Sequence, residues 1–162
     1  MPLSNLAVGS LRIESGFECQ KCNQLGIQVK NITVQHMVKD EYRSEVGLFD
    51  YYLCMNKDCD VSYYNPKVHK TFFKDQIRIP LWFKKDANPR YACYCSKVTE
   101  QDVIDAVVNE GATTMKEVLS ITGAMKISQC QKMNPLGKCC HQIILEAMKK
   151  GKDLKKSSET AN

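Results

Sequence analysis

Residues 129–142 read QCQKMNPLGKCCHQ, a segment in which a single cysteine is followed by an adjacent cysteine pair. The single cysteine is Cys130, and the pair is Cys139 and Cys140. Two neighbouring thiols cannot both reach one metal ion without contorting the backbone between them. We therefore expect one member of the pair to be a metal ligand and the other to have a different role.

Cysteine is abundant throughout the chain, with nine among 162 residues, an odd number. The first residues, MPLSNLAVGSLRIESG, lack the basic region and apolar run of a signal peptide, and the longest apolar stretch is far too short to span a bilayer. Clustered cysteines in a reducing compartment are typical of metal sites rather than of disulfides. We expect a soluble, cytoplasmic metalloprotein without membrane insertion.

The net charge is modest once metals are considered. The chain carries a formal +5 with neutral thiols. Four thiolates around Zn²⁺ or around an oxidised [2Fe-2S] cluster carry about −2, so two such sites would leave about +1. Much of the positive charge also lies in the last segment, KKGKDLKKSSETAN. Because nucleic-acid binding needs a basic patch on a folded face, the charge disfavours a nucleic acid as partner.

The hydrophobic pattern of the first half predicts strands. From residue 17 to about residue 80, the segments IQVKNITV, FDYYLC, VSYY and TFF are short and rich in aromatic and β-branched residues. The polar segment KKDANPR, residues 84–90, marks a junction. Trp82 and Phe83, just before it, are expected to fix the two halves to each other.

The second half predicts three helices. Thr99 precedes EQDVIDAVVNEG, which ends at Gly111, and Thr114 precedes MKEVLSITG, which ends at Gly123. A third helix is expected from about residue 140 to residue 150, stopped by Gly151. The predicted organisation is an N-terminal extension (1–16), a β-rich domain (17–88), a helical domain (89–150) and a basic disordered tail (151–162).

The first cysteine set lies in the predicted β-rich domain. ECQKC and CMNKDC supply Cys19, Cys22, Cys54 and Cys59. Two such pairs can complete a tetrahedron of four sulfurs with no open position, which is typical of structural zinc. A mononuclear iron site with the same ligands is the alternative, because tetrahedral S₄ suits both metals. We expect this half to fold around its metal.

The second set comprises Cys93 and Cys95 from YACYCSK, Cys130, and one of the adjacent pair. In an extended strand, C-x-C places two sulfurs on the same side, suited to one iron, and the other two thiols could hold a second iron of a [2Fe-2S] cluster. By spacing alone, a second zinc is nearly as good an interpretation.

Helix geometry distinguishes the two adjacent thiols. Residues three, four and seven positions on share a helix face with the starting residue. From Cys140 these residues are all apolar, whereas from Cys139 they are Gln142, Ile143 and Glu146. We therefore predict that Cys140 faces the cluster and that Cys139 is a free thiol at its rim. For Cys139 we expect a buried packing residue rather than a soft site for Cu⁺.

The motifs resemble a known family. CYC, two capped helices, a loop cysteine and GKCC at a third helix resemble the bacterioferritin-associated ferredoxin (BFD) type of [2Fe-2S] domain. CMNKDCDVSYYN, the run from TFFKDQIRIP to CYC, and QCQKMNPLGKCC resemble the N-terminal zinc and [2Fe-2S] half of the CopZ-type copper chaperone family, over roughly residues 17–150. The implied fold class is α+β: a small β-rich zinc domain followed by a three-helix BFD-like domain.

The resemblance also implies ligands and a function. It implies zinc on Cys19, Cys22, Cys54 and Cys59, and a [2Fe-2S] cluster on Cys93, Cys95, Cys130 and one of the pair, for which the helix argument selects Cys140. It implies copper handling, with reduction of Cu²⁺ to Cu⁺ or binding of Cu⁺. The family continues into a copper-binding domain with an M-x-C-x-x-C loop, which this sequence does not contain. We therefore expect the metal-loaded half to act with a separate redox or copper-trafficking protein.

Three functions remain open at the level of sequence. The leading hypothesis is a one-electron redox or metal-chaperone protein rather than a true enzyme. The alternative is a zinc-only module that binds protein or nucleic acid. A catalytic Cu²⁺ reductase would additionally need a partner that re-reduces the cluster.

Overall fold

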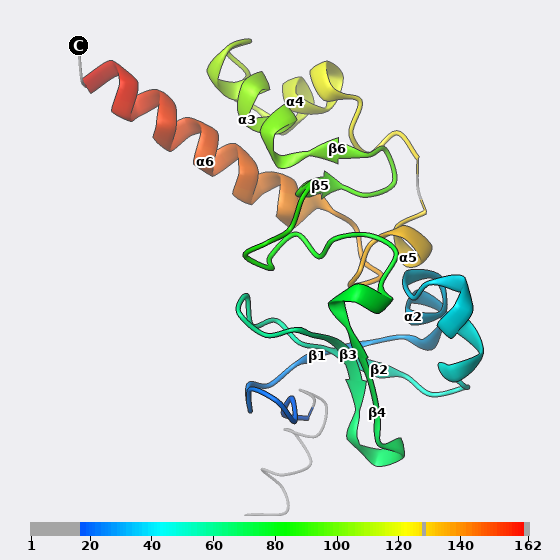
Figure 1. The fold of residues 1–162 in the computed structure, drawn as a ribbon. Helices are drawn as coiled ribbons and strands as arrows, with labels where there is room; N and C mark the ends of the chain where they lie inside the picture. Colours follow the sequence, from blue (N-terminus) through cyan, green and yellow to red (C-terminus); the bar gives the residue numbers. More distant parts are fainter. Residues whose placement is uncertain (1–16, 128, 161–162) are drawn as a thin grey trace, which may run out of the picture.

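The first half of the chain contains a four-stranded antiparallel sheet (Figure 1). The structure is a computed structural model that describes residues 17–127 and 129–160; the predicted extension 1–16 and the last two residues of the predicted tail lie outside them. The strands are β1 (Ile27–Val29), β2 (Tyr51–Leu53), β3 (Val61–Asn65) and β4 (Lys70–Phe73), in the order β1-β2-β3-β4. Three 3₁₀ helices, Asp40–Glu45, Pro66–Val68 and Lys74–Gln76, lie between or after them.

Both faces of the central strands are buried. Tyr51 and Tyr63 belong to the main apolar cluster of this half, which we call the sheet core. Tyr52 and Tyr64 face the other way and pack in a cluster with the buried cysteines Cys19, Cys54 and Cys59. Successive side chains alternate between the faces of a strand, so β2 joins the sheet core to the cysteine-rich side. The aromatic residues are therefore structural, and three of the strand predictions are confirmed.

The prediction of a long strand over IQVKNITV is wrong in its second part. Only Ile27–Val29 form β1, and Asn31–Met37 form helix α2. The buried residues Thr33, Val34 and Met37 follow a helical spacing. The first backbone N–H of α2, that of Asn31, donates to the Asp50 carboxylate at 2.9 Å. Asp50 lies in a distant segment, so this tertiary contact outweighs the strand propensity of the local β-branched residues.

The second half is mainly helical. A two-stranded antiparallel sheet, β5 (Tyr91–Cys93) and β6 (Val98–Thr99), is followed by α3 (Glu100–Val108), α4 (Met115–Thr122), α5 (Cys130–Met133) and α6 (His141–Thr160). Thr99 and Asp102 form the reciprocal capping bonds of α3, and Gly123 ends α4 with a φ of 78°. The three predicted helices are present, with the short α5 as an addition. The α+β class is therefore confirmed.

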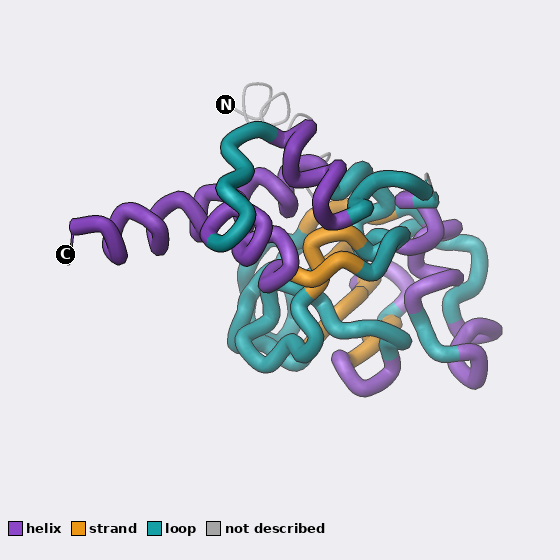
Figure 2. Tube along the Cα trace, turned by 90° about the horizontal axis from the view of Figure 1, so that it is seen from above, coloured by secondary structure: helices purple, strands orange, loops and turns teal. Residues whose placement is uncertain are grey.

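The third helix does not stop at Gly151 as predicted. α6 continues through it to Thr160, so residues 151–160 are helical and not a disordered tail, and the far end projects from the body (Figures 1 and 2). A Cβ at Gly151 would lie 2.9 Å from Cβ of Val107 in α3. Glycine here allows two helices to approach closely. No helix among the described residues is long and apolar enough to cross a membrane.

Two adjacent aromatic side chains join the halves, as expected. Phe83 packs against the sheet core, whereas Trp82 packs against the apolar cluster of the second half, which we call the helical core. Their rings meet edge to face at 4.9 Å. The Trp82 backbone N–H also donates to the Tyr94 hydroxyl at 2.9 Å, and Tyr94 lies in the C-x-C segment.

A second connection runs through the segment between the last cysteines. Leu136 packs against the sheet core, and the Tyr63 hydroxyl donates to the Pro135 carbonyl. Thr33 of α2 donates to the Gln131 carbonyl at 2.6 Å. A Cβ at Gly137 would lie 2.3 Å from Oγ1 of Thr33, so the backbone approaches α2 too closely for a side chain. The segment that carries Cys130 is therefore held by the first half.

Candidate metal centres

The first four cysteines converge beside the sheet. The sulfurs of Cys19, Cys22, Cys54 and Cys59 all lie within 4.8 Å of one another. Cys19 and Cys59 are 4.0 Å apart, and Cys22 and Cys54 are 3.6 Å apart. Sulfurs at the corners of a tetrahedral zinc site are about 3.8 Å apart, given Zn–S bonds of about 2.3 Å. The donor set and its size therefore fit a closed tetrathiolate site.

Tight turns present the thiols of this centre. In the first, the Asn23 N–H donates to the Cys19 carbonyl at 2.7 Å, and Asn23 has a φ of 64°. In the second, the Cys59 N–H donates to the Asn56 carbonyl at 3.2 Å, and the Asn56 side chain accepts from the Asp58 N–H at 3.0 Å. Asparagine tolerates left-handed backbone and caps its own turn, so both turns suit this residue type.

A buried lysine lies next to this centre. Lys84 is 1% exposed, and its Nζ donates to the carbonyls of Asn56 at 2.8 Å and Val61 at 2.9 Å. Burial lowers the pKa of Lys84, while the nearby Cys54 and Cys59 thiols oppose this change. A cation in this position offsets the net negative charge of a zinc tetrathiolate and fixes the turn between Cys54 and Cys59.

The thiols of the first centre differ in acidity. Burial raises the pKa of Cys19 and of Cys54. Burial also opposes ionisation of Cys22, but hydrogen bonds from the Gln24 backbone, Asn56 and neighbouring thiols lower its pKa to about 7. Zinc must displace the protons of the remaining thiols, so metal affinity falls as the pH is lowered.

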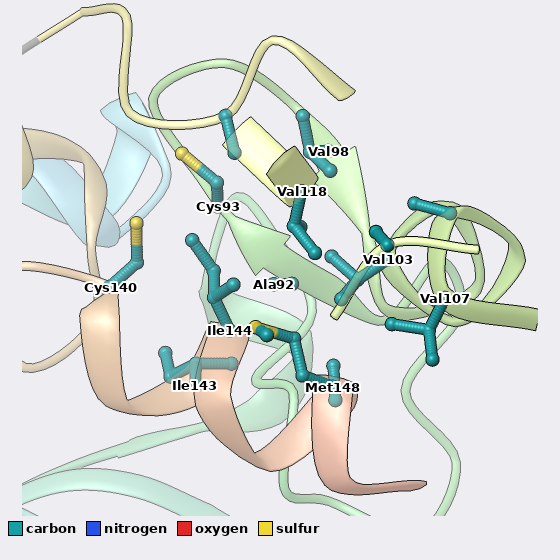
Figure 3. Close-up of a cluster of buried hydrophobic side chains, with 14 of the residues drawn as sticks. Ala92, Cys93, Val98, Val103, Val107, Val118, Cys140, Ile143, Ile144 and Met148 are labelled. Atoms are coloured by element: carbon teal, nitrogen blue, oxygen red, sulfur yellow. The ribbon is translucent and has the colours of Figure 1, made fainter. Parts of the chain in front are cut away.

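The second set of thiols is brought together from three segments. Cys93 ends β5, Cys95 lies in the following turn, Cys130 begins α5, and Cys140 directly precedes α6. Cys95 and Cys130 have sulfurs 3.7 Å apart. The sulfurs of Cys93 and Cys140 point toward the same space at the edge of the helical core (Figure 3) and interact with each other.

The prediction that both thiols of C-x-C share one side of a strand is wrong. The strand ends at Cys93, and the turn that follows takes Lys97 to a φ of 56°. Cys95 therefore pairs with Cys130, while Cys93 pairs with Cys140. Across the described residues, only the first set forms a compact group of ligand atoms. Two separated thiol pairs fit a binuclear cluster, which has one pair of protein ligands on each iron.

The adjacent cysteines have different environments. Cys140 is 1% exposed, whereas Cys139 is exposed, so the expectation that Cys139 is a buried packing residue is wrong. The Cys140 carbonyl accepts from the Ile144 N–H at 3.0 Å, so Cys140 occupies the position just before the helix. The predicted face beyond Cys140 is buried (Ile143, Ile144 and Ala147), as Figure 3 shows for the two isoleucines. The orientation of Cys140 is as predicted.

The thiols of the second set also differ in acidity. The pKa of Cys93 is lowered to about 5, first because Cys140 donates to it, and further by the Met125 and Ser96 groups near it. The same contact and burial raise the pKa of Cys140. Burial raises the pKa of Cys95 to about 11. Four thiolates can therefore coexist here only with a cationic centre between them.

Comparison with known proteins agrees with both centres. Residues 17–78 match zf_CopZ, described as a zinc binding domain, and residues 91–150 match Fer2_BFD, described as a BFD-like [2Fe-2S] binding domain. Copper chaperone CopZ of Archaeoglobus fulgidus is 32% identical over 123 residues, which cover 76% of this chain and 57% of that protein. The X-ray structure of the A. fulgidus CopZ N-terminal domain matches with a TM-score of 0.68 and 31% identity, over 80% of this chain and 96% of that domain.

The chain belongs to the CopZ family. It combines a CopZ-type zinc-binding domain with a BFD-like [2Fe-2S]-binding domain, as the motifs predicted. The match spans 57% of the length of the curated CopZ relative. The fold correspondence extends through the sheet half and the helical half alike, because it covers 96% of the solved CopZ domain.

Two residues near the centres were not identified from the sequence. Lys84 opens the polar segment KKDANPR, and Ser96 follows the C-x-C motif. Lysine and serine in polar segments are usually solvent-exposed, so neither carried a signal. The sequence offered one indication that Lys84 is buried, which is its position two residues after the predicted anchor Trp82.

Proposed function

We propose that this chain is a one-electron redox and metal-handling protein of copper homeostasis. Cys19, Cys22, Cys54 and Cys59 hold zinc within residues 17–88, and Cys93, Cys95, Cys130 and Cys140 hold a [2Fe-2S] cluster within residues 89–150. The observation that carries the proposal is the different geometry of the two thiol sets. The first is a compact group, whereas the second is two separated pairs. The relative named as a copper chaperone supports the link to copper.

The two centres have different tasks in this proposal. Zinc has no redox chemistry and a closed tetrathiolate site has no open position, so the first centre is structural. A bound [2Fe-2S] cluster supplies a one-electron couple, the chemistry that turns Cu²⁺ into Cu⁺. The protein holds the thiols, excludes water from Cys93 and Cys140, and leaves Cys130 more exposed than the other three. We place the contact with the electron acceptor or donor at the α5 side for that reason.

The test uses anaerobically purified protein reduced with dithionite and freed of excess reductant. Addition of Cu²⁺ should bleach the EPR signal of the reduced cluster and yield Cu⁺, trapped by a Cu⁺-specific chelator. Stoichiometry should approach one Cu⁺ per reduced chain, because each cluster gives one electron. A cluster that other oxidants oxidise but Cu²⁺ does not would replace the copper role with a general ferredoxin role.

A further inference from the structure

The sulfur of Cys93 is buried and accepts a backbone hydrogen bond. Cys93 is 0% exposed, so water cannot solvate a thiolate there. The backbone N–H of Met125 points at its sulfur, with the nitrogen 3.4 Å away. Met125 adopts a φ of 62°, a conformation that costs a non-glycine residue about 1 kcal/mol or more. The segment after α4 is therefore held in a strained turn that directs an N–H at this sulfur.

A buried hydroxyl in the turn that follows Cys93 is unpaired among the described residues. The Oγ atom of Ser96 is buried and makes no hydrogen bond within the described part of the chain. Ser96 lies three residues after Cys93, in the turn of residues 94–97 that joins β5 to β6. An unpaired buried hydroxyl costs about 1–3 kcal/mol, so a nearby acceptor is expected in the functional state. Cys93 directly precedes the same turn, and its sulfur already accepts from the Met125 N–H.

We propose that the Ser96 hydroxyl and the Met125 N–H donate hydrogen bonds to the Cys93 sulfur in the cluster-bound protein. These hydrogen bonds raise the reduction potential of the [2Fe-2S] cluster. The inference rests on the proposed [2Fe-2S] site. One-electron reduction makes the centre more negative by one charge. Donors aimed at a ligand sulfur stabilise the more negative state, and hydrogen bonds to sulfur are one of the means by which proteins set such potentials. Ser96 is a positioning and tuning residue, since it acts through Cys93.

The test compares two serine-to-alanine changes. Ser96→Ala removes the donor at Cys93, whereas Ser62→Ala removes another buried serine hydroxyl without a hydrogen bond, located in β3 of the zinc half. Ser96→Ala should load as much cluster as the unchanged protein and show a lower reduction potential in an anaerobic redox titration. Ser96→Thr, which keeps the hydroxyl, should restore most of the difference. Ser62→Ala should not move the potential.

A measurement on the unchanged protein keeps the inference testable if Ser96→Ala fails to load. In the reduced state, transfer to D₂O should remove proton hyperfine couplings of exchangeable hydrogens near the cluster, including that of the Ser96 hydroxyl. An unchanged potential in a fully loaded Ser96→Ala protein, an equal shift in Ser62→Ala, or no exchangeable coupling would each overturn the inference. Absence of any cluster in the unchanged protein would instead refute the proposed function.

Discussion

Cys139 and Cys140 are chain neighbours with opposite surroundings, one exposed and one 1% exposed. The thiol of Cys140 interacts with Cys93 and lies at the N-terminal end of α6, where the helix dipole offsets part of the cost of ionising it. We predict that Cys140→Ser abolishes or strongly distorts the visible absorbance and circular dichroism of the cluster, while Cys139→Ser leaves both nearly unchanged. The reverse pattern would overturn the ligand assignment, and equal losses would mean that either thiol can serve.

At the same scale, spacing identified seven of the eight cysteines in the two sets, and helix geometry was needed to choose Cys140 over Cys139. Thiols are recognisable because clustered cysteines have few other roles in a reducing compartment. Spacing could not pair Cys95 with Cys130, because that pairing depends on a turn that ends the strand at Cys93. Lys84 and Ser96 could not be found either, because their importance arises from burial next to sulfur and not from their residue type.

Among the elements, the caps of α3 and α4 depend on the local sequence, whereas the formation of α2 and the length of α6 depend on tertiary contacts. The caps of α3 and α4 were predictable, because Thr99, Thr114 and Gly123 act within one turn of chain. α2 was mistaken for a strand, and α6 was expected to end at Gly151, since both outcomes depend on neighbours distant in sequence. Asp50 helps to start α2, and α3 accommodates Gly151.

Replacement of Gly151 tests the packing of α6. A methyl group there would lie 2.9 Å from Cβ of Val107, so Gly151→Ala should destabilise the protein by about 1–3 kcal/mol despite the better helix propensity of alanine. Lys152→Ala, at the exposed next position, is the matched control and should be nearly neutral. Chemical unfolding monitored by far-UV circular dichroism measures both. Equal or higher stability of Gly151→Ala would indicate a helix end at this glycine rather than a close helix contact.

In the molecule as a whole, the two halves are held together more closely than their different sequence patterns suggested. The sheet half was expected to fold around its metal, and the two centres were assigned to separate domains. In the structure, Leu136 packs into the sheet core and the Tyr63 hydroxyl donates to Pro135. β3, which carries Tyr63, begins two residues after Cys59. Loss of zinc should therefore also loosen the segment that carries Cys130.

Two tyrosine variants isolate this coupling. Tyr63→Phe removes the hydroxyl that reaches Pro135, and Tyr51→Phe removes a hydroxyl that donates to Val46 at 2.7 Å within the sheet half. Both should lower the unfolding free energy by about 1 kcal/mol. Only Tyr63→Phe should speed the loss of cluster absorbance in the presence of an iron chelator. Equal rates for both variants would mean that the halves hold their metals independently.

Metal and sulfide analysis tests the central claim of two different centres most directly. The protein should be purified anaerobically after expression with ample iron, and iron, acid-labile sulfide and zinc should be measured per chain. The account predicts about two irons, two sulfides and one zinc, in a red-brown protein. About two zincs with no acid-labile sulfide, in a colourless protein, would contradict it and leave a zinc-only binding module.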